Sequence, residues 1–296
     1  MSKLFQAFVM VDWSAASKPA TGADSIWIGL IKRNVRFQPT YEAHNPSTRA
    51  EAEALISSLL TDFEKRGERA LFGFDFPLGF PRGTAAALKF SGDPWSAMLD
   101  FLAGEVKDKP TNANNRFQVA AKMNRLMTGG AFPFWGAPQR DAQTMLMVKR
   151  PREHDAGDLP EFRLAEAAAK GPSSVWKLYY QGSVGGQALT GLPMIRRLMK
   201  AHPGVQLWPF QTGWRPLTAK DVEETSAVFA EIYPSMFGAK PAANEIKDAA
   251  QVRAAAEHFA ALDEKLQLGK LFGPAKEDER REIVEREEGW ILGVPG

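Results

Sequence analysis

Phe8-Val9-Met10-Val11-Asp12-Trp13-Ser14 is the stretch that decides the fold, because it joins a continuous apolar run to a carboxylate and a small polar turn. A strand that is buried on both faces has such a run instead of an alternation of apolar and polar residues. Open α/β sheets bind their ligands at the carboxyl ends of their strands. Residues 5–12 are therefore predicted to form a buried strand that carries Asp12 to a site.

A second stretch repeats this pattern. Ala70-Leu71-Phe72-Gly73-Phe74-Asp75 is again an apolar run that ends on an aspartate, and Pro77 and Gly79 follow it. The segments between the two runs predict strands at 25–31 and 35–41 and a helix at 46–65 that ends at Gly67.

This order of elements brings the two aspartates together. When three meandering strands are followed by a helix and a fourth strand, the first and fourth strands can pair, about 4.8 Å apart. Asp12 and Asp75 then lie side by side at one edge of the sheet. Two carboxylates so close require a cation or a shared proton.

The composition narrows the class of protein. The 296 residues carry a net charge of +2, so the chain as a whole is not basic enough to demand a nucleic-acid partner. The chain has no cysteine, which excludes disulfides and thiolate metal sites and fits a reducing compartment. No signal peptide and no apolar stretch of about 20 residues is evident. We expect a cytoplasmic protein with no membrane partner.

Two further carboxylates stand at informative positions. Glu231 interrupts an apolar strand predicted at 227–234, where a glutamate is costly unless it is paired or binds a metal. Asp248 lies in the first turn of an alanine-rich helix predicted to about residue 262, with Asn244 as its N-cap. Asp248 can favour the helix dipole or point toward the sheet edge.

Together these acids predict a metal site made of oxygen ligands. Such ligands suit Mg²⁺ or Mn²⁺, and two such ions about 3.5–4 Å apart can activate a water and stabilise the leaving oxygen in phosphodiester cleavage. We expect Asp12 and Asp75 to be bridging ligands, and Asp248 and Glu231 to be outer ligands or water-orienting groups. The competing interpretation is that these acids cap turns and pair with Lys or Arg.

Residues 77–174 are predicted to form a long, helical and irregular insert, with one helix at about 115–127. From 105 to 152 nine cations face three acids, a local charge of +6, and four aromatic residues lie among them. Basic and aromatic side chains together suit a phosphate backbone and stacked bases; a solvated basic face beside an aromatic core is the alternative. The candidate phosphate and substrate contacts are Arg116, Lys122, Arg125 and, in the turn after the first strand, Ser14.

The segment after the insert contains a glycine-rich stretch. Strands are predicted at 175–180 and 205–210, and the glycines within 182–187 precede a helix predicted at 192–199. Such glycines either cradle a phosphate on backbone amides or form a plain turn. Near the C-terminus, 276–288 is predicted to be a solvated helix, and 289–293 to return to the core.

Several phrases resemble one family. V-D-W-S-A after the first strand, F-D-F-P-L-G after the fourth, E-I-Y-P-S, and K-D-A-A at the late helix are similar to bacterial proteins called predicted RNase H-like nucleases, a domain family of unknown function. The resemblance implies the RNase H-like fold. It makes Asp12 the first-strand acid, Asp75 the fourth-strand acid, Asp248 the helix acid and Glu231 the glutamate of the E-x-Y-P strand. For the first-helix glutamate of ribonuclease H, Glu51 and Glu53 are loose candidates.

We therefore expect one α/β domain over 1–296. Its RNase H-like mixed sheet has three antiparallel strands, then parallel strands, helices on both faces, and the insert at 77–174. The expected function is divalent-metal-dependent phosphodiester hydrolysis on a nucleic acid or nucleotide phosphate, with a metal at Asp12, Asp75 and Asp248. Two alternatives remain open: a non-catalytic nucleic-acid or nucleotide-binding module, and a phosphotransferase or nucleotide-cofactor enzyme on the same fold.

Overall fold

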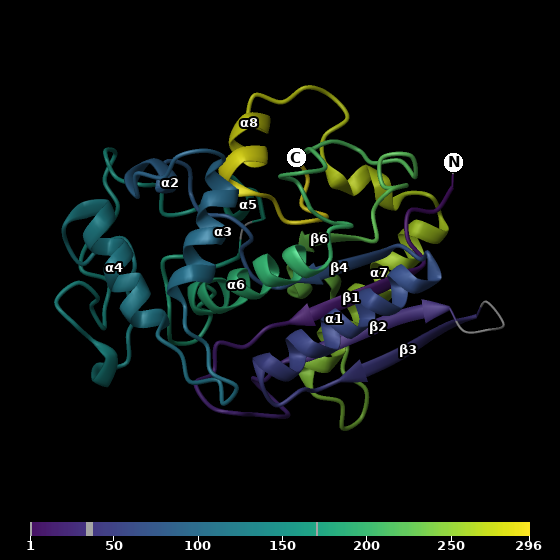
Figure 1. Cartoon of the computed structure of the whole chain (residues 1–296), viewed down its shortest axis with the longest axis horizontal. Helices are drawn as coiled ribbons and strands as arrows, with labels where there is room; N and C mark the ends of the chain where they lie inside the picture. Colours follow the sequence, from purple (N-terminus) through teal and green to yellow (C-terminus); the bar gives the residue numbers. More distant parts are fainter. Residues whose placement is uncertain (1, 34–37, 170) are drawn as a thin grey trace.

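A six-stranded mixed sheet forms the centre of the computed structural model, which describes residues 2–33, 38–169 and 171–296 (Figure 1). Its strand order is β3-β2-β1-β4-β6-β5. The strands are β1 (Ala7–Asp12), β2 (Trp27–Arg33), β3 (Pro39–His44), β4 (Ala70–Phe74), β5 (Val205–Leu207) and β6 (Ala227–Glu231). The predicted α/β class and the change from antiparallel to parallel pairing are confirmed.

The register of the central strands fixes where the two aspartates lie. β1 pairs antiparallel with β2 and parallel with β4, and Val11 of β1 is opposite Phe74 of β4. The next residues, Asp12 and Asp75, therefore leave the sheet at the same edge, as predicted. Part of the third strand predicted at 35–41 lies outside the described residues.

Helices cover both faces of the sheet, as the alternation along β1 requires. Val9 and Val11 belong to the apolar cluster that contains α1 (Arg49–Arg66) and α6 (Gly185–Ala201). Phe8 and Met10 point to the other face, where α7 (Lys247–Glu264) packs on β1 and β2. All four β1 side chains are buried, which explains the unbroken apolar run in the sequence.

The bounds of α1 follow from its caps. Thr48 accepts a hydrogen bond from the Glu51 amide, and the Glu51 carboxylate accepts one from the Thr48 amide, which makes a capping box. Gly67 ends the helix in the left-handed conformation, as predicted. Because Glu51 caps the helix, and Glu53 pairs with Arg197, neither glutamate reaches the aspartate pair.

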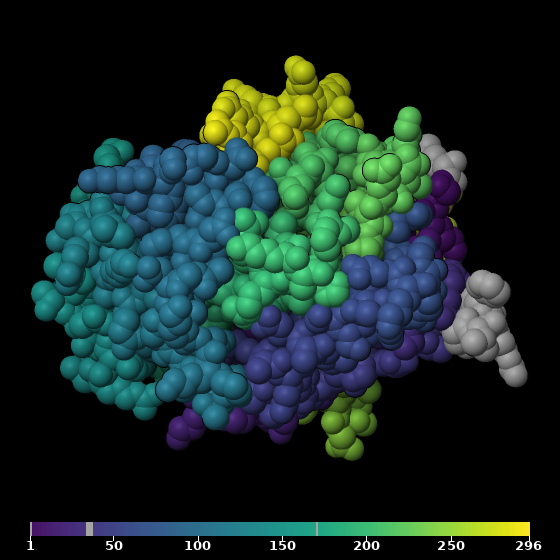
Figure 2. Space-filling view, in the orientation of Figure 1, coloured from purple at the N-terminus to yellow at the C-terminus, as the bar shows by residue number. Residues whose placement is uncertain are grey.

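The insert forms a lobe beyond the carboxyl end of β1, drawn in blue and teal in Figures 1 and 2. Its apolar side chains, including Phe117 and Phe134, belong to the same buried cluster as Val9 and Val11. Its helices are α2 (Thr84–Ala87), α3 (Pro94–Glu105), α4 (Arg116–Thr128), the 3₁₀ turn η1 (Gln139–Asp141) and α5 (Leu164–Ala169).

Three predicted elements are wrong. Residues 175–180 form turns with a single bridge from Lys177 to Trp135 instead of a strand. The helix predicted at 192–199 begins earlier, at Gly185, and continues through Pro193. The predicted start was too late because the glycines were assigned to a turn. The helix predicted at 276–288 is reduced to short turns, α8 (Arg281–Ile283) and the π-turn η4 (Val284–Glu288).

The helix α7 begins two residues later than predicted. Ile246, not Asn244, is the N-cap residue of α7, and it makes no side-chain capping bond. Trp290 and Ile291 are buried, so the return of 289–293 to the core is confirmed. Within the residues that the structure describes, no helix combines the length and the apolar character needed to cross a membrane.

Candidate functional site

Asp12 and Asp75 form a carboxyl pair at the end of β1 and β4. Their side chains hydrogen-bond to each other, and the Trp13 amide donates to Asp75 Oδ1 at 2.7 Å. A carboxyl–carboxyl hydrogen bond requires a proton on one partner. Among the described residues no Lys or Arg makes an ion pair with either acid, so the pair is not neutralised by the protein.

Burial and repulsion raise the pKa of both members of this pair. For Asp12 desolvation is the largest cause, followed by the charge and hydrogen bond of Asp75 and then the charges of Asp248 and Asp24, and its pKa lies well above the ordinary value. Desolvation raises the pKa of Asp75 to about 7, although the Trp13 amide opposes it. The two groups share the proton and titrate as a unit.

This pair predicts a pH dependence of stability in the absence of metal. Acids whose pKa is raised by folding stabilise the folded state below their ordinary pKa of 3.8, and this contribution is lost as the pH rises through about 7. From pH 4 to pH 8 the free energy of unfolding of wild type should therefore fall by roughly 2–4 kcal/mol relative to that of Asp75→Asn, which has no carboxyl group to ionise at this position. Urea denaturation in EDTA measures it, and parallel pH profiles for the two proteins would contradict the assignment.

Asp248 approaches this pair from the first turn of α7. Its charge raises the pKa of both Asp12 and Asp75, which places it within electrostatic reach of them. One of its oxygens, Oδ2, accepts a hydrogen bond of 2.8 Å from the Asp24 amide. Three predicted site acids therefore gather at one edge of the sheet, two in contact and the third nearby.

Glu231 lies in the same pocket but is engaged elsewhere. Arg163 donates to both of its carboxylate oxygens, at 2.8 and 2.5 Å, and the Leu78 amide donates to Oε2 at 3.0 Å. Arg163 is fully buried and also binds Glu166 through Nε at 2.7 Å. Burial raises the pKa of Glu231 and Arg163 opposes that shift, so the carboxylate of Glu231 is bound to Arg163 in the core.

The acid pocket is a cavity of about 340 Å³ that includes Asp12, Asp75 and Glu231 in its lining. Nowhere in the described ranges do three His, Asp or Glu side chains converge closely enough to hold a metal ion by themselves. The two aspartates nevertheless suit Mg²⁺ or Mn²⁺, because they are adjacent oxygen donors whose charge no protein cation offsets. Mg²⁺ commonly takes one or two carboxylates and completes its shell with water and substrate phosphate.

The predicted substrate contacts separate into two groups. Ser14 and Arg116 line a second cavity, of about 780 Å³, beside the acid pocket. Lys122 and Arg125 lie on the exposed side of α4, line neither cavity, and Lys122 pairs with Glu105 at 2.7 Å.

Three of the four aromatic side chains that lie among the cations of the insert are buried in the core. Phe117, Phe132 and Phe134 are buried. The aromatic rings that do reach solvent at the second cavity belong to Tyr179 and Tyr180, which the sequence analysis assigned to a strand. The only sequence signal for them was that two consecutive tyrosines end the strand predicted at 175–180.

Two backbone amides of the glycine-rich stretch are bound within the protein. The Ser183 amide donates to the Tyr180 carbonyl and the Gly185 amide to the Lys177 carbonyl, so both are already used. A Cβ at Gly185 would lie 2.1 Å from the Val175 carbonyl oxygen, which explains why glycine is needed where α6 begins. The stretch joins the helix to residues 175–178.

Comparison of the chain with protein-family models, with curated proteins and with solved structures gives no significant match.

Proposed function

We propose that the protein is a divalent-metal-dependent phosphodiesterase built on an RNase H-like sheet. The strand order, with antiparallel β3-β2-β1 followed by parallel β4 and β6, supports this fold. The contact between Asp12 and Asp75, with no Lys or Arg of the described chain in an ion pair with either, is the observation that carries the function. A cation bound by these groups would offset the desolvation and the neighbouring negative charges that raise their pKa values.

Each residue has a distinct task in this proposal. Asp12 and Asp75 bind Mg²⁺ or Mn²⁺, and the Trp13 amide holds Asp75 in place. Asp248 adds negative charge near the pair and is held by the Asp24 amide. A divalent ion at such a pair supplies charge neutralisation and activation of a water for attack on phosphorus. The substrate is a nucleic acid or a nucleotide phosphate.

Glu231 does not take part in this chemistry. Its carboxylate neutralises Arg163 and fixes the turn at Leu78, which follows Asp75 by three residues. Glu231 therefore positions the end of β4 and acts on the site only through the backbone.

Calorimetric titration with Mn²⁺ tests the metal site. Wild type is expected to bind saturably and to release protons, because metal must displace the proton shared by Asp12 and Asp75. Asp12→Asn is expected to weaken binding by at least about tenfold, as loss of one carboxylate removes a direct ligand. Saturable binding of equal affinity in both proteins would exclude the pair as the metal site.

A non-catalytic nucleotide-binding module is the second candidate. The observation in its favour is that the described acids do not converge as a group of three. This candidate predicts that Asp12→Asn and Asp75→Asn keep full affinity for nucleic acid and that metal adds no turnover.

A further inference from the structure

We propose that the cavity lined by Arg116, Tyr179 and Tyr180, here called the tyrosine–arginine pocket, binds a nucleotide whose base is unpaired. Arg116 holds a phosphate, and a tyrosine ring stacks on the base. The inference rests on the proposed function and adds to it the substrate class: single-stranded nucleic acid or a free nucleotide, and not a duplex.

Arg116 is the first support, because its guanidinium is buried without a counter-charge. Only 3% of the residue is exposed, and it makes no ion pair with a carboxylate in the described part of the chain. Its Nη1 donates to two neutral oxygens, Ser17 Oγ at 3.2 Å and Asn114 Oδ1 at 3.0 Å. Its Nε has no partner. Buried charges are rarely left unpaired, so an anion from outside is the missing partner.

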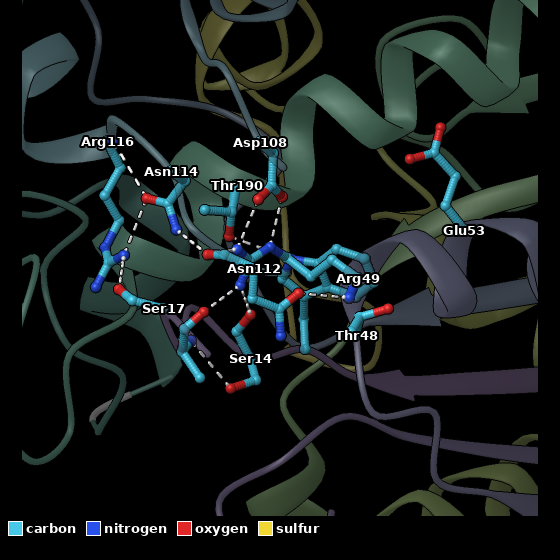
Figure 3. A network of polar contacts seen from close by, with 12 residues as sticks. Ser14, Ser17, Thr48, Arg49, Glu53, Asp108, Asn112, Asn114, Arg116 and Thr190 are labelled. Atoms are coloured by element: carbon cyan, nitrogen blue, oxygen red, sulfur yellow. Dashed lines mark hydrogen bonds and ion pairs between the residues drawn. The ribbon is translucent and has the colours of Figure 1, made fainter. Parts of the chain in front are cut away.

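The two acids whose charges reach Arg116 are bound by other arginines, Asp141 by Arg140 and Asp108 by Arg49. The nearby carboxylate of Asp108 is bound in a bidentate pair to Arg49, Nε to Oδ2 at 2.5 Å and Nη2 to Oδ1 at 2.7 Å. Figure 3 shows Asp108 directed at Arg49, while Arg116 lies to the side with Asn114 and Ser17. Arg49 also binds the Ser14 carbonyl at 2.9 Å, which fixes the loop that forms the floor of the pocket.

The electrostatics of the pocket favour an anion. Desolvation and then the positive charge of Arg49 lower the pKa of Arg116 to about 10, so the group remains charged at neutral pH but lacks stabilisation. Lys18 and Arg140 also line the pocket, and Asp24 is its one acidic lining residue in the described chain. A phosphate would offset the excess positive charge.

The tyrosines are the second, independent support. Tyr179 and Tyr180 are 42% and 48% exposed, although large aromatic side chains are normally more buried. Their rings are in edge contact with centroids 5.0 Å apart, and Tyr179 also contacts Phe117 edge-on at 6.4 Å. Each of the two rings thus packs against a neighbouring ring and is still nearly half exposed. Exposed, supported rings are the surfaces on which unpaired bases stack.

The pocket is placed to feed the aspartate pair. Ser183 and Gln187 line both the tyrosine–arginine pocket and the acid pocket, so the two cavities adjoin. A strand bound with one phosphate at Arg116 can therefore present a neighbouring phosphate to Asp12 and Asp75. Bases in a duplex are stacked on their own neighbours and cannot lie on a tyrosine ring without being unpaired.

Fluorescence anisotropy without metal tests this pocket independently of catalysis. The Asp75→Asn protein is titrated into a labelled single strand of about 12 nucleotides, and into the same sequence as a blunt duplex. The single strand should bind at least about tenfold more tightly. Because no turnover or metal is involved, a failure of the phosphodiesterase proposal leaves this readout unchanged.

Arg116→Gln and Tyr180→Ala are then introduced into the same background. We expect each to weaken single-strand binding by about 5-fold to 100-fold, with a smaller salt dependence only for Arg116→Gln. The matched controls are Arg66→Gln, which removes an exposed cation on α1, and Phe162→Ala, which removes an exposed ring. Because Tyr180 is exposed, its variant keeps the test valid if Arg116→Gln does not fold.

The outcomes separate the possible ligands. Competition by a nucleoside monophosphate at equal affinity supports the pocket and identifies a free nucleotide as its ligand; weak competition supports a strand. Equal binding of duplex and single strand, or unchanged binding in Tyr180→Ala, would overturn the proposal.

Discussion

Metal-dependent hydrolysis of a phosphodiester is expected to fall about 10³-fold or more in Asp12→Asn and in Asp75→Asn. A bound metal contributes several kcal/mol of charge stabilisation, and about 4 kcal/mol corresponds to that factor. Turnover of a chromogenic phosphodiester with saturating Mn²⁺ measures the loss. Burial disfavours the charged form of both carboxyls, and Asn removes that charge at nearly the same shape, so neither variant should unfold more easily than wild type.

Asp93→Asn is the matched control for this measurement. Asp93 is exposed and its side chain makes no capping hydrogen bond at α3, so hydrolysis should remain at the wild-type rate. Turnover that persists in both Asp12→Asn and Asp75→Asn would exclude these acids from the reaction. Activity that is absent from wild type as well would leave the binding module as the better account.

Arg163→Met is expected to lower the free energy of unfolding by about 3–5 kcal/mol. Removing one partner of a buried ion pair leaves an uncompensated charge, and here Glu166 and Glu231 both lose their partner. The Glu288 carbonyl also loses its donor, at 2.8 Å. Urea denaturation followed by tryptophan fluorescence measures the effect.

Arg253→Met serves as the control, because Arg253 also pairs with a glutamate, Glu245, but at the surface. Its loss should cost about 1 kcal/mol or less. A triple variant that also carries Glu166→Gln and Glu231→Gln should recover part of the stability lost in Arg163→Met, since the buried charges are removed together. Equal stability of Arg163→Met and wild type would show that the cluster is not needed for folding.

The sequence was sufficient to predict the central strands and their aspartates. The apolar runs before Asp12 and Asp75 record burial on both faces, and the order of elements between them leaves few ways to pair the strands. The ends of α1 were also predictable, since Thr48 and Gly67 act through contacts within a few residues of themselves.

The rest depended on contacts between distant residues. Glu231 is held by Arg163, and no spacing rule connects positions 68 residues apart. Gly185 looks like a turn residue, yet it begins a helix. The position requires glycine because the Val175 carbonyl lies where a side chain would be. The segment 175–180 has the composition of a strand, but of its residues only Lys177 forms a bridge.

The pairing of β4 with β6 has a consequence for synthesis of the chain. The two strands are neighbours in the sheet, yet the contact between Leu78 and Glu231 spans 153 residues. At about 5–20 residues per second, roughly 8–30 s pass between the synthesis of β4 and that of β6. During this interval β1 can pair with one edge of β4, but the edge that later binds β6 has no partner strand and can pair with other nascent chains. Aggregation during expression should therefore depend on how fast the second half of the chain is translated.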